Sequence, residues 1–312
     1  MLNKFILPQD KNIFNEVWVL ALPVIVSNLS RVLMSLVDVA MVGRLGPEAL
    51  AAAGMGGMLV WGALSIMLGV RTSVQTVSSR RLGQNKTKDC VKALNNGFLM
   101  ATIYSIPVSL VCWFFGFVII PFFVVDEITT PLAISYFSIS SLGLFFNSIS
   151  FVFQGFFTGI EKTKVLLSVT ISSNIINVYF NIGLIYGKNS ISKISSDYFG
   201  EVFDISVFWF WAKFDGFGVT GAAIGTLIAS AWMMFHYYIY LNRQKIVKNS
   251  KGIMNVGFDK NMLIKQVKLS VPMGVQEMMI AIGWSVFYKI MAIIGIIELA
   301  TTQLLFTIMH AS

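Results

Sequence analysis

The sequence predicts an all-α, polytopic membrane protein, in which a six-helix bundle is followed by the start of a second bundle. Of its 312 residues, 56% are hydrophobic and 12% are charged, which is about half the share of charge that is usual in a soluble domain. The apolar residues form blocks longer than the ~20 residues that a helix needs to cross a bilayer. A frame of residues from the first block also recurs in the seventh, which indicates a second bundle.

Seven apolar segments are long enough to span a membrane. The predicted spans are 17–43, 48–79, 93–121, 129–158, 165–187, 217–241 and 262–294, and an eighth begins near residue 297. Pro23 lies inside the first span, where a bend is tolerated if neighbouring helices satisfy the freed carbonyl group. The Gly-Arg-Leu-Gly-Pro link at 43–47 is so short that the first two spans form an antiparallel hairpin.

Positive charges collect in every second link. Lysines and arginines follow the second, fourth and sixth spans, whereas the link after the third span carries Asp126 and Glu127 and no cation. Because cytoplasmic loops are enriched in Lys and Arg, we expect the N-terminus in the cytoplasm. The formal net charge of +8 follows from these loops and does not indicate nucleic-acid binding.

The link at 188–215 is long, nearly balanced in charge and contains the aromatic cluster 208–211. Aromatic side chains favour the boundary between water and lipid. We therefore expect this link outside the cell, with a short helix that lies on the membrane surface.

The first span carries one acid, Asp38, within an apolar helix. A charged group at the bilayer centre costs roughly 2.5–3.5 kcal/mol on insertion scales, so an intramembrane acid is a functional candidate. Burial favours the neutral form of a carboxylic acid, and a proton gradient could then load and unload Asp38. Sodium, a hard cation suited to oxygen ligands, is the alternative, and a structural acid bonded to a neighbouring helix is the third possibility.

Four polar residues in the fifth span, Thr170, Asn174, Asn177 and Asn181, are spaced by four, three and four positions. This spacing places them on one stripe of a helix. For Asn177 and Asn181 we favour the wall of an ion pocket with Asp38. Asn174 is equally compatible with a pocket and with interhelical hydrogen bonding.

Three further charges lie within predicted spans: Arg31, Arg71 and Glu277. Arg31 precedes Asp38 on the same helix face, ~10 Å away at 1.5 Å per residue. We hypothesise that Arg31 or Arg71 pairs with Glu277 and that breaking this pair gates a cleft. Alternatively, each arginine extends toward the interface.

The chain shows no metal-ligand constellation, phosphate-binding loop or nucleophile–base pair. We therefore expect no enzymatic activity and no cofactor, only a coupling ion, either H⁺ or Na⁺.

An internal repeat sets the expected domain organisation. Pro23 aligns with Pro272, Gly46 with Gly295 and Leu50 with Leu299. We expect an N-terminal six-helix lobe at 1–245, a cytoplasmic inter-lobe loop at 246–261 and an incomplete second lobe at 262–312. On this interpretation the chain is C-terminally truncated, and it is inactive without the missing helices of the second lobe. Parallel repeats of this kind are a transporter architecture.

Four ordered motifs support a family resemblance. The run 36–43, Leu-Val-Asp-Val-Ala-Met-Val-Gly, resembles the first helix of multidrug and toxic compound extrusion (MATE) transporters. The runs 154–159, Gln-Gly-Phe-Phe-Thr-Gly, and 177–181, Asn-Val-Tyr-Phe-Asn, resemble the link after helix four and helix five of that family. The run 216–226 resembles the beginning of its helix six.

The resemblance implies a twelve-helix, two-lobed exporter in a bacterial inner membrane. It would expel small organic compounds, often cationic, by alternating access against H⁺ or Na⁺. Similarity to the DinF-type branch implies that Asp38 couples the ion, with Tyr136, Asn177, Asn181 and Thr226 as neighbours. Members of that branch often carry a second acid where this chain has Asn181, so the coupling ion stays open.

Other function classes make different demands on the sequence; a channel, for example, would conduct passively. A lipid-linked oligosaccharide flippase of the same exporter superfamily would need a strongly basic cavity. Arg31 and Arg71 are the only residues that indicate such a cavity in the sequence. A membrane-embedded enzyme would need paired catalytic residues at one depth, which the sequence does not contain.

Overall fold

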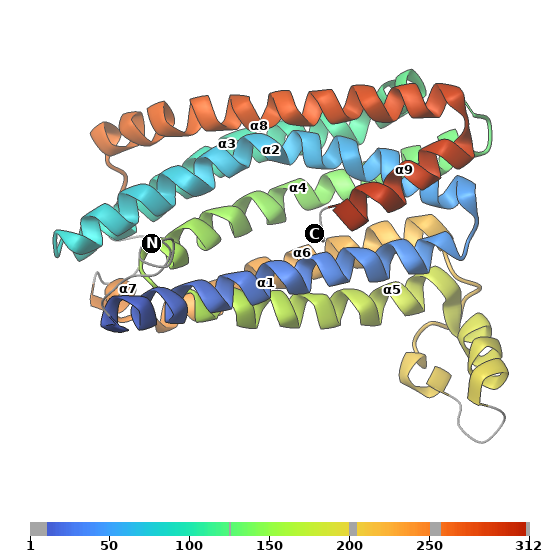
Figure 1. The fold of residues 1–312 in the computed structure, drawn as a ribbon, viewed down its shortest axis with the longest axis horizontal. Coiled ribbons are helices and arrows are strands. Elements are labelled where there is room, and N and C mark those ends of the chain that lie inside the picture. The colour runs from blue at the N-terminus through green and yellow to red at the C-terminus, as the bar shows by residue number, and fades with distance from the viewer. Residues whose placement is uncertain (1–10, 125, 200–204, 250–256, 310–312) are drawn as a thin grey trace, which may run out of the picture.

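The computed structural model is a bundle of long helices that run side by side along one axis (Figure 1). It describes residues 11–124, 126–199, 205–249 and 257–309. Within these ranges, seven helices are long and apolar enough to span a membrane. This confirms the polytopic, all-helical class that the composition predicts.

The chain alternates between the two ends of the bundle. We call the end with the turn at residues 43–47 the turn end, and the end with Arg80, Arg81 and Lys86 the basic end. The helices are α1 (Lys11–Gly43), α2 (Pro47–Gly83), α3 (Thr87–Phe123), α4 (Thr129–Gly159), α5 (Lys164–Phe199), η2 (Ile205–Trp209), α6 (Gly218–Arg243), α7 (Lys245–Asn249), α8 (Lys260–Ile294) and α9 (Ile296–Met309).

The observed helices extend the predicted spans by a few polar residues at the basic end. Helix α3 begins at Thr87 rather than at residue 93, because its first turn is polar and continues beyond the apolar block. Asp89 in this turn suits the positive end of the helix dipole and lies 3.1 Å from Lys92 Nζ. Hydropathy predicts the apolar part of a span, and such polar turns fall outside it.

The link after the fifth span folds back on α5 instead of extending away from it. Gly187 has a left-handed backbone (φ 69°) and kinks α5 there. Beyond the kink the Lys188 backbone N–H donates to the Ala212 carbonyl at 2.8 Å. The indole N–H of Trp209 donates to the Tyr179 carbonyl at 2.7 Å, and its ring stacks on that of Tyr179. The aromatic cluster thus attaches this link to the turn end of α5.

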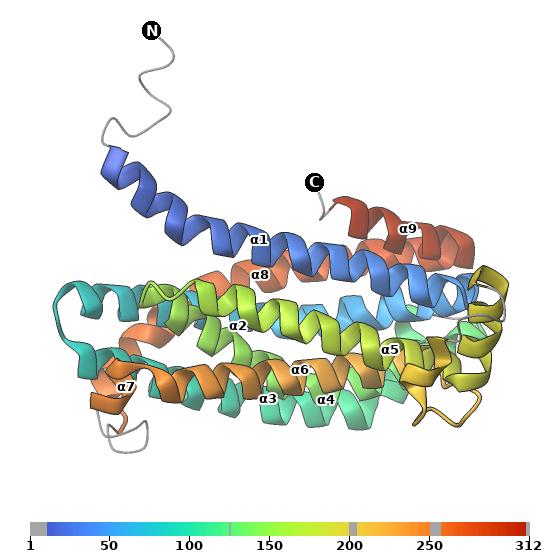
Figure 2. The same ribbon diagram turned by 90° about the horizontal axis from the view of Figure 1, so that it is seen from below.

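Helix α2 lies at the centre of the bundle and packs against α4 on one side and α8 on the other (Figures 1 and 2). Gly69 of α2 lies so close to the backbone of Ser270 and Gly274 in α8 that a side chain at 69 would collide with them. Small residues permit this kind of close helix approach in membranes. The hydroxyl of Ser270 also donates to Ser73 Oγ at 2.9 Å.

Helix α8, which the sequence assigns to a second lobe, therefore packs directly on spans of the predicted first lobe. Besides α2, it contacts α3, where Gln266 Nε2 donates to the Ala93 carbonyl at 3.0 Å. The described residues form one bundle, and the lobe boundaries at 245 and 262 stay a prediction. Part of the predicted inter-lobe loop, residues 250–256, lies outside the described residues.

Candidate functional site

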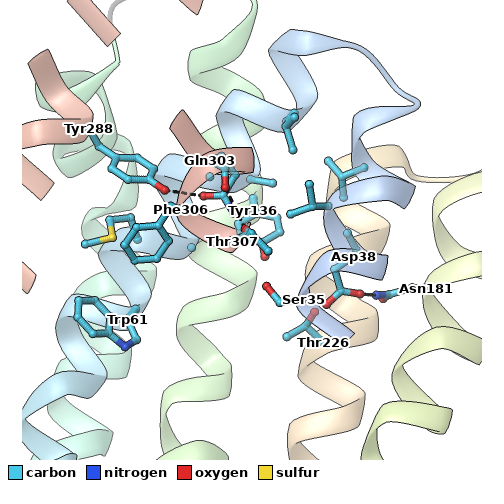
Figure 3. Close-up of a pocket in the computed structure, with 18 of the residues that line it drawn as sticks. Ser35, Asp38, Trp61, Tyr136, Asn181, Thr226, Tyr288, Gln303, Phe306 and Thr307 are labelled. Atoms are coloured by element: carbon cyan, nitrogen blue, oxygen red, sulfur yellow. Dashed lines mark hydrogen bonds between the residues drawn. The ribbon is translucent and has the colours of Figure 1, made fainter. Parts of the chain in front are cut away.

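A cavity of about 420 Å³ opens among the helices toward the turn end of the bundle (Figure 3). Its lining residues come from α1, α2, α4, α5, α6, α8 and α9. Four of the five residues predicted to couple an ion line this cavity: Asp38, Tyr136, Asn181 and Thr226. The fifth, Asn177, lies directly behind Asn181.

Asp38 lies at one end of a short chain of polar contacts that joins α1, α5 and α6. The side-chain amide of Asn181 donates to Asp38 Oδ1 at 2.9 Å and also contacts Asn177 Oδ1 at 3.1 Å. The amide of Asn177 donates in turn to Thr226 Oγ1 at 3.4 Å. The carboxyl group on α1 is thus connected through α5 to α6.

Helix geometry explains this arrangement. Asn177 and Asn181 are one turn apart on α5, so their side chains lie one above the other on the same face. Gly225 of α6 lies against Asn181, and a Cβ atom at 225 would overlap Asn181 Oδ1. Glycine at 225 thus leaves room for the amide of Asn181 to reach Asp38.

The pocket offers more oxygen atoms than its internal hydrogen bonds use. Asn181 is 1% exposed, and its Oδ1 atom is buried without a hydrogen-bond partner in the structure. The carboxylate of Asp38 and the hydroxyl of Thr226 are nearby acceptors. Oxygen ligands of this kind suit a hard monovalent cation such as Na⁺, whereas the described residues contain no cluster of three His, Cys, Asp or Glu side chains.

The part of the polar stripe of α5 that lies nearer the basic end makes different contacts from the part nearer the turn end. Thr170 Oγ1 lies 2.7 Å from Ser27 Oγ of α1. The amide of Asn174 donates to the carbonyl and hydroxyl oxygens of Ser30, at 3.0 and 2.8 Å. These hydrogen bonds hold α1 against α5. Asn174 is thus placed in interhelical bonding, outside the lining of the cavity.

Tyr136 of α4 lines the same cavity as Asp38. Its ring packs against Gly56 of α2, where an added Cβ atom would approach it to 2.8 Å. A phenol at this position supplies one donor and one acceptor on the wall of the cavity opposite α5.

The three charges proposed to gate a cleft are not joined in this structure. Arg31 lines the cavity with Asp38, whereas Arg71 is not among the lining residues. Across the described part of the chain, no ion pair connects Glu277 to either arginine. The paired state that the sequence suggests is therefore not the state seen here, and its gating role stays a prediction.

Several lining residues were not predicted from the sequence. Ser35 precedes Asp38 by three positions, and that helical spacing is a signal that could have identified it. Tyr288 of α8 donates from its hydroxyl to Gln303 Oε1 of α9 at 2.8 Å, and Trp61 of α2 lies below this pair (Figure 3). No local pattern marks these residues, because only the packing of α8 and α9 onto α2 brings them to the cavity.

A bundle of membrane-spanning helices that encloses a cavity with one intramembrane acid is an arrangement typical of membrane transporters. The sequence model of the MatE family matches residues 23–182, just over half of the chain. The chain belongs to the MatE family. This establishes the family to which the motifs point, and no catalytic family is indicated.

Bacterial relatives agree with this assignment. A probable multidrug resistance protein NorM of Photorhabdus laumondii is 27% identical over 219 residues, which cover 68% of this chain and 43% of that relative. A probable multidrug resistance protein YpnP of Bacillus subtilis is 23% identical over 277 residues, covering 87% of this chain and 55% of that relative. The chain thus spans about half the length of these relatives.

Solved structures share the fold. One described as a MATE protein in complex with MaL6 has a TM-score of 0.72 at 17% identity and is matched over 88% of this chain and 55% of its own length. Another, described as the inward-facing conformation of a multidrug resistance MATE family transporter, has a TM-score of 0.70 at 16% identity, over 92% and 60%. None of these relatives is described as a flippase, so the comparisons do not favour that alternative.

Proposed function

We propose that the protein is a secondary active efflux transporter that exchanges small organic compounds for H⁺ or Na⁺ by alternating access. The observation that carries this proposal is the intramembrane contact between Asp38 and Asn181 in the wall of a cavity large enough for a small ligand. The names of the bacterial relatives, which describe multidrug resistance, support this substrate class and a location in the bacterial inner membrane.

Asp38 is the proposed coupling group. In its charged form it attracts a cation, and Asn181 and Thr226 contribute further oxygens. Binding of H⁺ or Na⁺ neutralises the carboxylate, which removes the cost of a charge in low dielectric. With Asp38 neutralised, the cavity can change from being open on one side of the membrane to being open on the other. The proposed assignment to the DinF-type branch rests on this acid in the first helix.

A two-lobed arrangement with parallel repeats is the proposed frame for alternating access. The sequence repeat pairs Gly54 of α2 with Gln303 of α9, and these two residues touch: a Cβ atom at 54 would lie 2.9 Å from Gln303 Cβ. Residues near a two-fold axis contact their own repeat counterparts, so this contact supports two related halves. The proposed orientation places the N-terminus and the basic end in the cytoplasm, because Lys and Arg gather there.

Dye efflux from vesicles tests the proposal. Vesicles that carry the protein together with the expected second-lobe helices should expel a fluorescent organic cation when a pH or Na⁺ gradient is imposed, whereas residues 1–312 alone should not. Asp38→Asn should abolish the response to the gradient, whereas Glu127→Gln, an exposed acid outside the cavity, should leave it unchanged. Efflux that ignores both gradients, or that is the same in Asp38→Asn, would contradict the proposed function.

A further inference from the structure

A groove of about 510 Å³ lies between α2 and α8 at the basic end of the bundle. Among the described residues it shares no lining residue with the cavity around Asp38, and none of those that line it is an acid. Four of its nine lining residues carry a positive charge, two from each helix: Arg80, Arg81, Lys265 and Lys268. We call this feature the basic groove.

The spacing of the lining residues explains why the charges of the two helices face each other. On α2, the groove is lined by positions 76, 77, 80, 81 and 84, and on α8 by positions 262, 265, 268 and 269. Residues three or four positions apart are neighbours on one face of a helix. Each helix therefore presents a single stripe to the groove, and each stripe carries two cations.

Buried hydrogen bonds fix the backbones that carry these stripes. Gln266, which lies between the two lysines in the sequence, is fully buried and donates to the Ala93 carbonyl of α3 at 3.0 Å. One turn further along α8, the hydroxyl of Ser270 donates to Ser73 Oγ of α2 at 2.9 Å. A site whose helices are already in place binds a ligand at a smaller entropic cost than a mobile surface does.

Acids of the fold neutralise little of the charge in the basic groove. Arg81 Nε lies 4.0 Å from Asp89 Oδ2, which is the longest of the three ion pairs in the described ranges, and Asp89 lies closer to Lys92, at 3.1 Å. The other three cations of the groove take part in none of these ion pairs. Because like charges repel one another, an anion between the two stripes would be stabilised by all four.

The basic groove lies where the apolar belt of the bundle begins. The apolar block of α2 ends near residue 79, so its two arginines follow directly. The two lysines of α8 lie within the apolar span that begins near residue 262, roughly 4.5–9 Å from its start at 1.5 Å per residue. Beside them, three apolar side chains of α8 are exposed: Val267, Leu269 and Val271. A molecule in the groove therefore meets positive charge at one end and an apolar helix face at the other.

We propose that the basic groove binds the phosphate head group of an anionic phospholipid, whose acyl chains lie along the exposed apolar face of α8. Guanidinium groups bind phosphate oxygens through paired hydrogen bonds, and lysines bind them as point charges. Basic pockets between membrane helices suit the head groups of anionic lipids. The bound lipid contacts α2 and α8 together and stabilises their packing at the basic end. The site does not depend on the exporter function proposed above.

Two lipids with the same acyl chains test the site. Dioleoyl phosphatidylglycerol and dioleoyl phosphatidylcholine differ in the net charge of their head groups, and native mass spectrometry of the purified protein in a neutral detergent measures the affinity of the first bound lipid molecule. Phosphatidylglycerol should bind at least tenfold more tightly than phosphatidylcholine. Equal affinity for the two lipids overturns the proposal.

Variants assign the binding to the groove. Arg80→Gln and Lys268→Gln, at two exposed positions, should each weaken phosphatidylglycerol binding roughly fivefold, which corresponds to ~1 kcal/mol for a cation near the membrane surface. The double variant should weaken it further. Arg243→Gln removes the same charge from the last turn of α6, at the same end of the bundle but outside the groove, and should bind normally. If Arg243→Gln weakens binding as much as Arg80→Gln does, net charge rather than the groove attracts the lipid, and the proposal fails.

A soluble phosphate tests whether the ligand is a lipid. Glycerol 3-phosphate carries the phosphate of the head group without acyl chains, so it should displace bound phosphatidylglycerol only at a concentration at least 100-fold higher than that of the lipid. Displacement at a concentration similar to that of the lipid would identify the groove as a site for soluble phosphates and overturn its assignment to a phospholipid.

Thermal unfolding tests the bridge between the two helices. A ligand that binds only the folded state raises its stability. Phosphatidylglycerol should therefore raise the unfolding temperature of the original protein more than that of the Arg80→Gln/Lys268→Gln double variant. An equal rise in both proteins would contradict binding across the basic groove.

Discussion

The two halves of the α1–α5 interface use similar side chains for different purposes. Toward the basic end, Asn174 and Thr170 have close partners in Ser30 and Ser27. Toward the turn end, Asn181 meets Asp38 and keeps a buried oxygen without a partner. We call the first half the clasp and the second half the ion pocket. The comparison teaches that an incompletely satisfied polar group distinguishes a site from a structural contact on one helix stripe.

A matched pair of asparagine variants tests most directly whether the clasp and the ion pocket have different roles. Asn181→Ala removes the hydrogen bond to Asp38, and because a bond to a charged group contributes about 1.5–3 kcal/mol, gradient-driven efflux should fall roughly 10- to 100-fold. Asn174→Ala should leave efflux per folded molecule unchanged and lower the unfolding temperature instead. Equal loss of efflux in both variants would show that the stripe is not divided as described.

A substitution in α6 tests whether Asn181 needs the space that Gly225 leaves for its side chain. Gly225→Ala places a methyl group where Asn181 Oδ1 lies, and such overpacking typically costs about 1–3 kcal/mol. We expect a lower unfolding temperature together with lost ion coupling. Gly283→Ala is the control, because no atom lies within 4 Å of its added Cβ atom. If Gly225→Ala behaves like Gly283→Ala, the close approach of α6 to Asn181 is not needed.

A carboxylate outside the membrane gives a contrast to Asp38. The Met262 backbone N–H, which donates to Asp259 Oδ1 at 3.0 Å, holds the pKa of Asp259 below its ordinary value, and Lys92 adds to this shift. Removing this N-cap by Asp259→Ala should cost about 1 kcal/mol. A lowered pKa stabilises the fold above the ordinary pKa near 3.9, and this contribution disappears as the pH falls through the lower pKa of the folded state.

The measurement is the difference in unfolding temperature between the original protein and Asp259→Ala as a function of pH. The difference should be constant at neutral pH and shrink only in strongly acidic solution. A difference that already disappears around neutral pH would contradict the capping role.

The smallest expected effect belongs to the clasp. Ser27→Ala removes the contact with Thr170, and interhelical hydrogen bonds in membranes contribute about 0.6 kcal/mol on average. Thermal unfolding should shift slightly and efflux should be unchanged. The control is Ser79→Ala, whose hydroxyl bonds only within its own helix. A large loss of efflux in Ser27→Ala would extend the ion pocket into the clasp.

Much of the fold and part of the site were predictable from the sequence. The long apolar blocks and their short links predict the order of the spanning helices. The acid in the first span marks Asp38 as a candidate site, and the spacing of four residues between Asn177 and Asn181 places these two asparagines on one helix face. The contributions of Tyr288 and Gln303 were not predictable, since they depend on how α8 packs on α2. The expected pair with Glu277 is not formed in this structure and stays a prediction, because depth along a helix does not specify which face meets which neighbour.

The most direct test of the ion pocket is the thermal stability of the purified protein with and without its coupling ion. Unfolding temperatures are measured across Na⁺ concentrations at constant ionic strength, and separately across pH, for the original protein and for Asp38→Asn. A bound ion stabilises the fold by ~2.7 kcal/mol at a concentration of 100 times its dissociation constant. The account predicts a shift with Na⁺ or with pH that is missing in Asp38→Asn. Identical shifts in both proteins would contradict it.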